Sequence, residues 1–474
     1  MFDARPVDAA GQAKRPEDSG KRERRYVIRD GYVMSMDKTV GDFVRGDVLI
    51  EGKTIVAVGP HLHAGDAEAI DARGRIVMPG FIDTHHHQFE TALRGFLANG
   101  ILFDDGKPHA TWNYFEHILF TFAPVYRPED VYISELFGGL SQLDAGVTTT
   151  HDISQIHHSP EHSDAAIAAL KDTGRRAVFG YFESAGNVGG NQYPQDARRI
   201  RKQYFSSTDQ LVTMIMGGEI YLQGFEQAWA IGRELGLQVA AHIVGSFGMA
   251  PTFDALAAAG QFGPDNLFIH MTGMSDMSWD RVKDAGAGVS LAVPIEMNMR
   301  HGMPPILKAL SLGIKPSLSV DVECTLTADL FTQMRSTMAL QRALVNQMAL
   351  DTGNPADLPE LLNARDVLNF ATVQGAADLR LDAKVGSLTP GKEADIILLD
   401  AEAINVSPLN HVPGAVVSLM DRSNVETVIV AGRICKWKGQ LVDVNLPNLQ
   451  RKLEKSRDYL FEAADIPQDP FRAD

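Results

Sequence analysis

A short segment near the start of the chain ends in three consecutive histidines, in the sequence IVMPGFIDTHHH that covers residues 76–87. An apolar run that is broken by Pro-Gly and then resumes predicts a buried strand, which here carries imidazoles to the rim of the fold. Side chains alternate between the two faces of a strand, so His85 and His87 share one face and His86 lies on the other. Two imidazoles on one face form half of a metal site. A chance cluster of polar residues at a strand end is the alternative.

Three later apolar segments each end in one further potential ligand. His242 lies in AAHIV, His270 in LFIHM and Asp321 in LSVDV. A single histidine in an apolar run is more often a core residue than a ligand. Because these residues each lie at the end of a separate predicted strand, they indicate, with His85 and His87, a shared metal centre.

This set of side chains predicts hydrolysis by a metal-activated water. Three neutral imidazoles and a carboxylate suit one divalent ion, with zinc as the first choice and iron, manganese and cobalt as alternatives. An open coordination position would hold a water molecule, whose pKa such an ion lowers to about 7. Asp321 is the candidate acceptor of the proton from that water, which requires hydrogen-bond reach.

The middle of the chain alternates between apolar strand-like runs and amphipathic helical segments. Eight such runs are expected, at residues 76–87, 147–153, 177–183, 211–220, 238–244, 267–272, 289–296 and 316–323. Parallel strands that are covered on both faces have continuous apolar sequences, and eight of them predict a closed (β/α)8 TIM barrel. An open doubly wound sheet is the competing architecture, but it gives less reason for polar residues at nearly every strand end.

Both ends of the chain show the shorter alternation that is typical of antiparallel strands. We expect them to form one small discontinuous β-sandwich around an inserted barrel. The predicted division is a flexible arm at residues 1–24, the composite β-sandwich at 25–75 and 384–444, the barrel at 76–383, and a C-terminal helix and tail at 445–474.

Composition limits the partners of the protein. The formal net charge of the 474-residue chain is −16, which disfavours nucleic acid and anionic membranes. No apolar run has the length of a membrane span, and the N-terminus lacks the apolar core of a secretory signal. The two cysteines, Cys324 and Cys435, form no disulfide framework. We therefore expect a cytoplasmic protein whose partner is a small-molecule substrate.

Several motifs together resemble the amidohydrolase superfamily. They are PGFIDTHHH at residues 79–87, GVTTT at 146–150, SVD at 319–321 and VGSLTPGKEADIILLD at 385–400, with the strand-end histidines between them. The resemblance covers roughly residues 25–440 and is greatest to the branch of cytosine-deaminase-like and triazine chlorohydrolase or aminohydrolase enzymes. It implies a barrel with a β-sandwich built from both chain ends.

The resemblance also assigns roles to individual residues. It implies that His85, His87, His242 and Asp321 bind the metal, and that His270 orients the water or the substrate. Deaminases of this branch usually carry a glutamate three residues after the strand-five histidine, where this chain has Gly245.

Another departure concerns strand four, where binuclear members often use a carboxylated lysine. No lysine lies between Lys202 and Lys283, and the carboxylate that ends this strand is Glu219. Glu219 is therefore a candidate proton shuttle, substrate anchor or bridging ligand for a second ion. A helix-capping or solvent-facing carboxylate is the alternative.

The long segment at residues 88–124 is rich in aromatic residues and predicts a lid or binding loop. Gln88 and Trp112 from this segment are candidate substrate-binding residues, and so are Glu296 and His301 after strand seven. A hydrophobic cluster that packs the loop onto the barrel is the alternative.

The function expected from these residues is cleavage of a C–N bond in a cyclic, aromatic or heterocyclic molecule, by deamination or amide-type hydrolysis. One alternative is a binuclear hydrolase of cyclic amides or carbamates with Glu219 as a bridge. Another is a scaffold that kept the fold without catalysis. A homo-oligomer, a dimer or a tetramer, is also expected.

Overall fold

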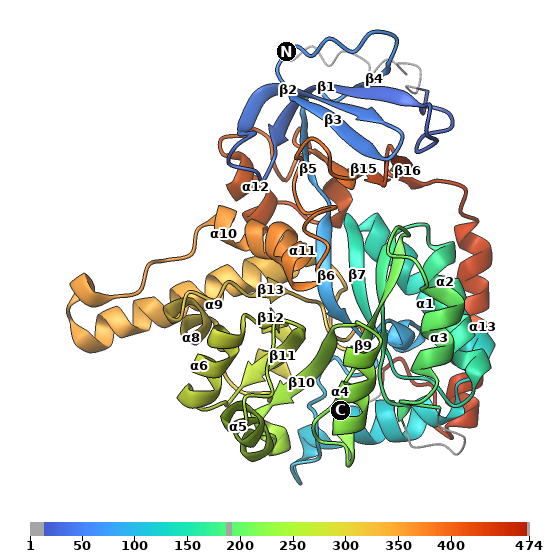
Figure 1. Ribbon diagram of the computed structural model, residues 1–474, viewed down its shortest axis with the longest axis vertical. Helices are drawn as coiled ribbons and strands as arrows, with labels where there is room; N and C mark the ends of the chain where they lie inside the picture. The colour runs from blue at the N-terminus through green and yellow to red at the C-terminus, as the bar shows by residue number, and fades with distance from the viewer. Residues whose placement is uncertain (1–13, 186–191, 472–474) are drawn as a thin grey trace.

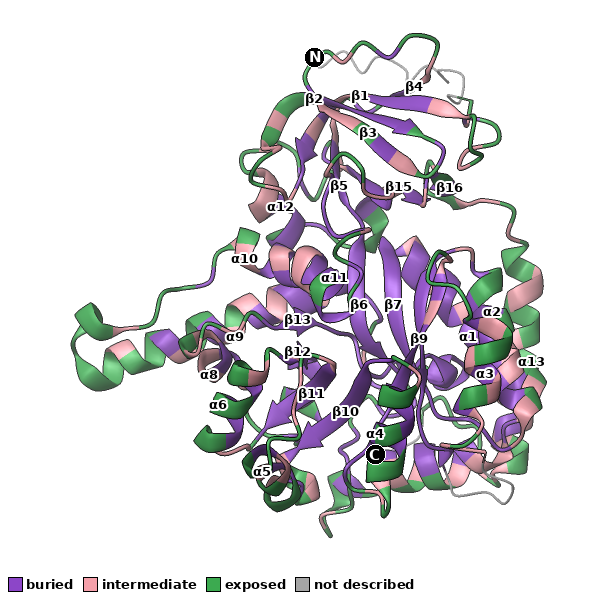
Figure 2. Cartoon of the chain, viewed as in Figure 1, coloured by how far each residue is buried: buried purple, intermediate pink, exposed green. Residues whose placement is uncertain are grey.

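Eight parallel strands form one sheet in the order in which they occur in the sequence. The computed structural model describes residues 14–185 and 192–471. The strands are β6 (Phe81–His86), β7 (Val147–Ser154), β8 (Arg176–Tyr181), β9 (Val212–Gly217), β10 (Val239–Val244), β11 (Asn266–Thr272), β12 (Gly288–Leu291) and β13 (Ser317–Leu318). Nearly all of their residues are buried (Figure 2), because a parallel sheet is covered on both faces.

The sheet closes where the segment after β13 returns to β6. The backbone N–H of Asp321 donates to the carbonyl oxygen of His85 at 2.9 Å, and the N–H of His87 donates to the carbonyl oxygen of Asp321 at 2.9 Å. The predicted TIM barrel is confirmed. Its closure is made by the backbone of three residues that were predicted to bind metal.

Helices surround the barrel (Figure 1). They are α1 (Pro128–Asp144), α2 (Pro160–Asp172), α3 (Ala197–Tyr204), α4 (Phe225–Glu234), α5 (Ala250–Ala258), α6 (Asp276–Ala285), α7 (Val293–Asn298), α8 (Ile306–Ser311), α9 (Leu330–Thr352), α10 (Ala364–Asn369) and α11 (Gly375–Asp378). Shorter 3-10 and π segments are η1 (Gln88–Leu93), η2 (Pro108–Ala110), η3 (Tyr114–Phe122), η4 (Ala123–Val125), η6 (Gly245–Phe247), η7 (Pro355–Asp357), η8 (Phe370–Gln374) and η9 (Arg422–Asn424). The long α9 ends at Gly353, whose φ of 62° is the left-handed conformation that glycine adopts without strain.

A second, mixed sheet is built from both ends of the chain. Its strands are β1 (Arg25–Met34), β2 (Asp42–Glu51), β3 (Thr54–Gly59), β4 (Glu68–Asp71), β5 (Arg75–Pro79), β14 (Ile396–Asp400), β15 (Val425–Val430), β16 (Arg433–Trp437) and β17 (Gln440–Leu441). The two ends meet where β5 pairs with β14 in antiparallel register, with Pro79 opposite Ile396. Two helices follow in the C-terminal part, α12 (Val412–Ser418) and α13 (Leu446–Ala463).

The predicted first strand is divided into two strands that belong to different sheets. Gly80 separates β5, in the mixed sheet, from β6, in the barrel. A Cβ atom at Gly80 would lie 2.2 Å from the side chain of Thr148, so the chain passes β7 too closely for any side chain there. The predicted boundary at residue 76 therefore moves to Gly80.

Part of the arm predicted at residues 1–24 contacts the mixed sheet. Ser19 accepts a hydrogen bond on Oγ from the N–H of Ile434 at 3.0 Å, and Arg24 forms an ion pair with Glu68 at 2.8 Å. Residues 14–24 therefore lie against the mixed sheet. Residues 1–13 lie outside the described part of the chain.

The last two barrel strands are shorter than predicted. The seventh ends at Leu291, and Glu296 belongs to the helix α7, because Pro294 at the second position of that helix favours a helix start. The eighth is regular only at Ser317–Leu318 before the irregular segment that carries Asp321.

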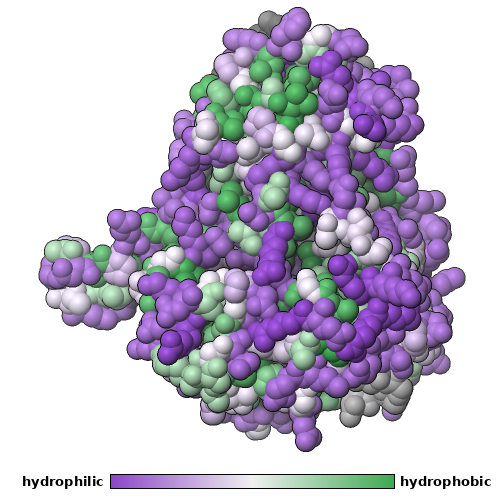
Figure 3. Space-filling view, viewed as in Figure 1, coloured by the Kyte–Doolittle hydropathy of each residue, from purple (hydrophilic) through white to green (hydrophobic). Residues whose placement is uncertain are grey.

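Among the described residues, no helix is long and apolar enough to span a membrane. Hydrophilic side chains cover most of the face shown in Figure 3, and apolar ones occur there in separate patches.

The first prediction concerns the ion pair that joins the barrel to the mixed sheet. Arg176 is buried, and its guanidinium contacts Asp395 at 3.1 Å and Glu393 at 2.6 Å. We expect Arg176→Met to lower the free energy of unfolding by about 3–5 kcal/mol, because it leaves a buried carboxylate without its partner. Urea unfolding measures this.

The matched control is Arg198→Met, which removes an exposed ion pair with Glu234. We expect it to change the free energy of unfolding by about 0–1 kcal/mol. Equal effects of the two substitutions would contradict the proposed role of the buried pair.

Candidate metal centre

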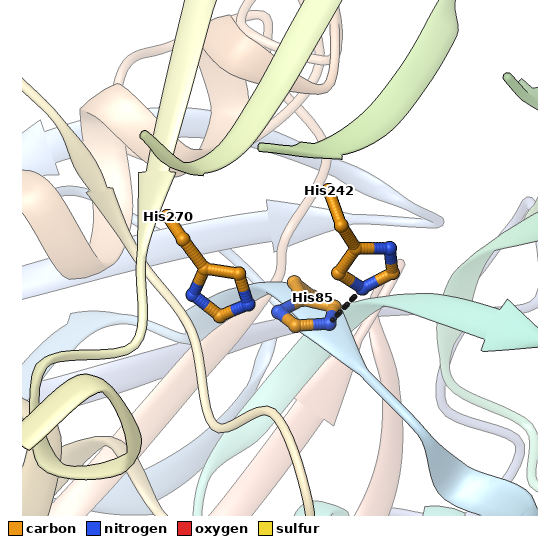
Figure 4. Close-up of side chains that lie close together, drawn as sticks. All are labelled: His85, His242 and His270. Atoms are coloured by element: carbon orange, nitrogen blue, oxygen red, sulfur yellow. Dashed lines mark hydrogen bonds between the residues drawn. The ribbon is translucent and has the colours of Figure 1, made fainter. Parts of the chain in front are cut away.

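Three histidines from different strands point toward one another at the end of the barrel (Figure 4). Nε2 of His85, on β6, lies 3.0 Å from Nε2 of His87 and 3.0 Å from Nε2 of His242, on β10. Oδ1 of Asp321 lies 3.5 Å from Nε2 of both His85 and His87. The structure therefore brings together the four residues that were predicted to bind metal.

In His242 and His87, the hydrogen-bond partner of Nδ1 determines which ring nitrogen carries the proton. Nδ1 of His242 donates to Oε1 of Glu219 at 2.6 Å, because a carboxylate accepts hydrogen bonds. Nδ1 of His87 donates to Oε1 of Gln155 at 2.8 Å, because the amide nitrogen of Gln155 donates to a neighbouring carboxylate. The Nε2 atoms of His242 and His87 therefore carry lone pairs, and both face His85.

Converging lone pairs with a carboxylate beside them are the arrangement that a cation satisfies. Burial lowers the pKa of His85 and of His87 well below the usual value, which disfavours the imidazolium form of either ring. Oδ2 of Asp321 is buried without a hydrogen-bond partner. The residues thus fit a divalent ion with mixed imidazole and carboxylate ligands.

His270, on β11, lies on the other side of the same point. Its Nε2 lies 3.5 Å from Oδ2 of Asp321, and its ring is 4.6 Å, between centroids, from that of His301. His270, His301 and Asp321 offer ligand atoms within 4.8 Å of one another, as do His85, His242 and His270. His301 also lines the central cavity, and its substrate-binding role stays a prediction.

Two residues at the centre have a left-handed backbone, which L-residues rarely adopt. The φ angle is 71° at His270 and 70° at Asp321. Such conformations cost about 1–3 kcal/mol each and persist only where the surroundings hold them. At Asp321 the backbone hydrogen bonds to His85 and His87 provide that support.

Glu219 and Glu296 lie behind histidines and do not line the cavity. Glu219 contacts Nδ1 of His242, on the side of the ring away from the other ligands, so it does not bridge a second ion at Nε2. Burial lowers and Glu219 raises the pKa of His242, with a net upward shift. Glu296 accepts from Nδ1 of His270 at 3.1 Å and from the N–H of Ala292 at 2.9 Å. The structure places both glutamates behind histidines, and their predicted catalytic and substrate-binding roles stay predictions.

Gln88 and Trp112 also do not line the cavity. The amide of Gln88 donates to the backbone oxygen of Glu135 at 2.6 Å and accepts from Arg175, so it faces α1. Trp112 packs its ring against Phe96, at 5.5 Å between centroids. Both side chains pack the loop onto the barrel, and the predicted substrate-binding roles of Gln88 and Trp112 stay predictions.

The carboxylate of Asp83 links β6 to the segment after β13 through hydrogen bonds to their backbones. Its Oδ1 accepts from the N–H of Val320 at 3.0 Å and from the N–H of His85 at 3.3 Å. Its Oδ2 accepts from Gln142 at 2.6 Å. This carboxylate fixes the backbone on both sides of the closure.

A group of three polar residues was missed by the sequence analysis. Gln155, after β7, donates from Nε2 to Oε1 of Glu183 at 2.9 Å, and the hydroxyl of Tyr221 donates to the same oxygen. Burial and the nearby Glu219 raise the pKa of Glu183 to about 7. Glu183 is the last residue of the predicted strand 177–183, and Gln155 lies two residues after the predicted strand 147–153, positions that could have identified them.

Three further histidines near the end of β7 are buried: His157, His158 and His162. His157 contacts Oγ of Ser163 at 2.8 Å, and His162 contacts the backbone oxygen of Tyr126 at 3.0 Å. His162 lies in α2, and the segment around η4 covers the histidines by accepting from His158 at the backbone oxygen of Ala123.

The cavity at the metal centre is small, with a volume of about 40 Å³. Its polar lining comes from the ligand set, from His270 and His301 and from Gln155 and Tyr221. Apolar side chains make up the rest of the wall: Leu102, Tyr114, Phe115, Leu119, Val244, Phe247, Ile295, Met299 and Val322.

The sequence profile of the Amidohydrolase family matches residues 76–435. The chain belongs to the amidohydrolase family. As a member, it is a metal-dependent hydrolase that acts on C–N bonds other than peptide bonds. The family predicted from the sequence motifs is thereby confirmed.

Curated relatives of this amidohydrolase include two groups of deaminases. The 5'-deoxyadenosine deaminase of Methanosarcina mazei is 28% identical over 86% of this chain and 92% of its own length. The 5-methylthioadenosine/S-adenosylhomocysteine deaminase of Pelotomaculum thermopropionicum is 24% identical over 90% of this chain and 97% of its own length.

Solved structures show the same fold. An adenosine deaminase from Xanthomonas campestris with bound zinc has a TM-score of 0.79 and 21% identity, and covers 93% of this chain and 100% of its own. An atrazine chlorohydrolase from Arthrobacter aurescens complexed with zinc has a TM-score of 0.73 and 19% identity, and covers 91% of this chain and 100% of its own.

The second prediction tests the hydrogen bond behind His242. We expect Glu219→Ala to weaken zinc binding by about 10–100-fold, because the imidazole loses the partner that fixes its tautomer and orientation. Competition with a chromogenic chelator measures the dissociation constant. Glu226→Ala, in the exposed part of α4, is the control and should leave zinc affinity unchanged. Equal affinities for the two variants would contradict this role of Glu219.

The third prediction concerns pH. Burial raises the pKa of Asp321 to about 7, so below about pH 7 a metal ion must displace a proton from this carboxyl. We expect zinc affinity to fall by roughly tenfold or more for each pH unit below 7, and to level off above it. Titrations from pH 5 to 8 measure the slope. Asp321→Asn should bind zinc more weakly with a shallower slope, and an unchanged slope would refute the assignment.

Proposed function

We propose that this protein is a deaminase that removes an amino group from a nitrogen heterocycle with one zinc ion, held by His85, His87, His242 and Asp321. The convergence of three imidazole nitrogens and a carboxylate in a cavity with apolar walls carries this proposal. A bound zinc ion would supply a water molecule that is deprotonated near neutral pH. The zinc in two solved relatives supports this choice of metal.

Asp321 and His270 are the residues that handle protons and orient the reactants. Oδ2 of Asp321 has no hydrogen-bond partner, so it is free to accept a proton from water. Nε2 of His270 lies 3.5 Å from that oxygen, and Glu296 holds the ring from behind. A substrate atom between Asp321 and His270 would therefore meet a proton acceptor on one side and an imidazole on the other.

The walls of the cavity favour a flat, unsaturated ring. Phe115 and Phe247 pack edge to face at 5.0 Å between centroids, and both line the cavity. Aromatic walls with a few convergent polar groups are typical of sites for planar ligands. The curated relatives with adenosine-type substrates support a purine-like ring.

Gly245 occupies the position where related deaminases usually have a glutamate. A Cβ atom there would lie 2.9 Å from the backbone oxygen of Thr272 and 3.1 Å from Cα of Gly273. The turn after β10 thus has no space for a longer side chain. The proton donor to the substrate must come from another part of the cavity, where Tyr114, Tyr221 and His301 are placed.

The fourth prediction tests the activity. We expect the zinc-loaded protein to release ammonia from at least one compound in a panel of adenosine, 5'-deoxyadenosine, cytosine, pterin and melamine, as measured by a coupled assay. Asp321→Asn should lower kcat by about 10²–10⁴-fold, because the proton acceptor is lost. The control Asp276→Asn changes an exposed carboxylate on α6 and should leave kcat unchanged.

Other outcomes of this experiment point to the alternatives. Ring opening of a cyclic amide without ammonia release would favour amide-type hydrolysis. Two tightly bound ions per chain would favour the binuclear enzyme, although Glu219 faces away from the other ligands. No turnover with zinc, iron, manganese or cobalt would favour a non-catalytic scaffold.

A cytoplasmic location and a homo-oligomer, dimer or tetramer, remain part of the proposal. The helix α9 extends away from the rest of the molecule (Figure 1), and Leu350 near its end is 79% exposed. This projection supports contact with a second copy of the chain. Light scattering coupled to gel filtration measures the mass in solution.

A further inference from the structure

A second, larger chamber lies beside the metal cavity and shares part of its wall. Its volume is about 430 Å³, compared with about 40 Å³ for the cavity at the metal centre. Phe115, Leu119 and Tyr221 line both spaces. The outer chamber is otherwise formed by residues that follow β8 and β9, and by Phe120 from η3.

The size of the metal cavity limits how much of a substrate it holds. A single water molecule needs roughly 10–15 Å³ of cavity volume measured in this way, so the inner space corresponds to a few water molecules. Only the reacting part of a substrate fits there. The remainder must extend past the shared wall, and the outer chamber is the space on the other side of that wall.

Glu183 is a buried polar residue in the wall of the outer chamber. Its side chain is more than nine-tenths buried. Oε1 accepts from Nε2 of Gln155 at 2.9 Å and from the hydroxyl of Tyr221, whereas Oε2 is buried without a hydrogen-bond partner. A buried carboxylate oxygen that lacks a donor is costly, and a ligand that supplies one removes this cost.

The same carboxylate is connected to the metal centre. Gln155 donates to Glu183 and accepts from Nδ1 of His87 at 2.8 Å. The free oxygen of Glu183 is thus attached, through two hydrogen bonds, to a predicted metal ligand. A molecule that reaches Glu183 therefore also lies within reach of the reacting centre.

The charged and polar residues that line the outer chamber determine which substituents of a ligand bind there favourably. Among the described residues that line it, Glu183 is the only charged one, and no lysine, arginine or histidine faces an anion there. The remaining wall combines aromatic and aliphatic side chains with the uncharged polar residues Ser184, Gln223 and Gln227. A phosphate or carboxylate would meet a like charge, whereas a hydroxyl or ammonium group would donate to the free oxygen.

We propose that the outer chamber binds the part of the substrate that is remote from the cleaved C–N bond, and that Glu183 selects a hydrogen-bond donor on that part. This inference rests on the proposed function, since it takes the metal cavity as the site of reaction. Deamination of the ring does not by itself specify the other substituents of the substrate. The inference adds that the preferred substrate carries a hydroxyl or ammonium substituent and no anionic group.

The fifth prediction uses compounds that have no amino group to release, so that binding is measured without turnover. Isothermal titration of the zinc-loaded wild-type protein compares purine riboside, which has hydroxyl donors, with 9-ethylpurine, which has none. We expect purine riboside to bind at least about tenfold more tightly, because a hydrogen bond to a buried carboxylate contributes strongly. Equal affinity of the two compounds, or no binding of either, overturns the inference.

Two further compounds distinguish the kinds of donor and test the exclusion of anions. Purine riboside 5'-monophosphate should bind at least tenfold more weakly than the riboside. The 5'-amino-5'-deoxy derivative of the riboside should bind more tightly than the riboside if an ammonium is preferred, and equally if a hydroxyl suffices. Tight binding of the monophosphate would contradict the proposal.

Glu183→Gln tests the residue itself. We expect the preference for the riboside over 9-ethylpurine to fall to within about threefold, while zinc content and melting temperature stay unchanged. The control Glu226→Gln, on the exposed part of α4, should keep the full preference. An unchanged preference in Glu183→Gln overturns the role of this residue, and the wild-type comparison still decides the inference if that variant does not fold.

Failure of the proposed function gives a different result. If the wild-type protein binds the riboside in a Glu183-dependent way but releases no ammonia from any member of the panel, the deaminase proposal is wrong and the chamber remains a binding site. If ammonia is released but the preference does not depend on Glu183, the deaminase proposal stands and the chamber inference is wrong.

Discussion

The structure depends on one unfavourable arrangement, in which imidazole lone pairs face one another inside a buried site. The Nε2 lone pairs of His87 and His242 both face Nε2 of His85 at 3.0 Å, and a single N–H of His85 satisfies only one of them. The barrel enforces this arrangement, because the backbone hydrogen bonds of Asp321 to His85 and His87 also close the sheet. Binding of a cation and closure of the barrel thus depend on the same residues.

Groups behind the ligands hold the rings so that their lone pairs point inward. Glu219 and Gln155 take the Nδ1 protons of His242 and His87, and Glu296 holds the ring of His270. Since an imidazole donates from one nitrogen when it binds a metal with the other, these contacts select the tautomer before an ion arrives. The two glutamates therefore contact histidines and do not line the cavity.

The polar groups that face a substrate are distributed differently from what the family resemblance implied. The turn at Gly245 is too close to the backbone of Thr272 for a glutamate. Polar side chains that follow β7, β8 and β9 lie on the substrate side instead, where Gln155, Glu183 and Tyr221 form one hydrogen-bonded group. The polar wall of this cavity thus contains a hydrogen-bonded group that the strand-five motif does not describe.

The sequence by itself determined the barrel, the mixed sheet from both chain ends and the positions of the potential ligands. It did so because parallel strands are buried on both faces, alternate their side chains with a period of two, and carry functional residues at their carboxyl ends. That reasoning applies only to residues in regular strands and at their ends. Only the tertiary structure decided that Gln88 packs against α1, that Glu219 lies behind His242, and that Glu183 keeps a free oxygen beside the cavity. The orientations of these side chains are set by contacts between segments that are far apart in the chain, so no local sequence pattern predicts them.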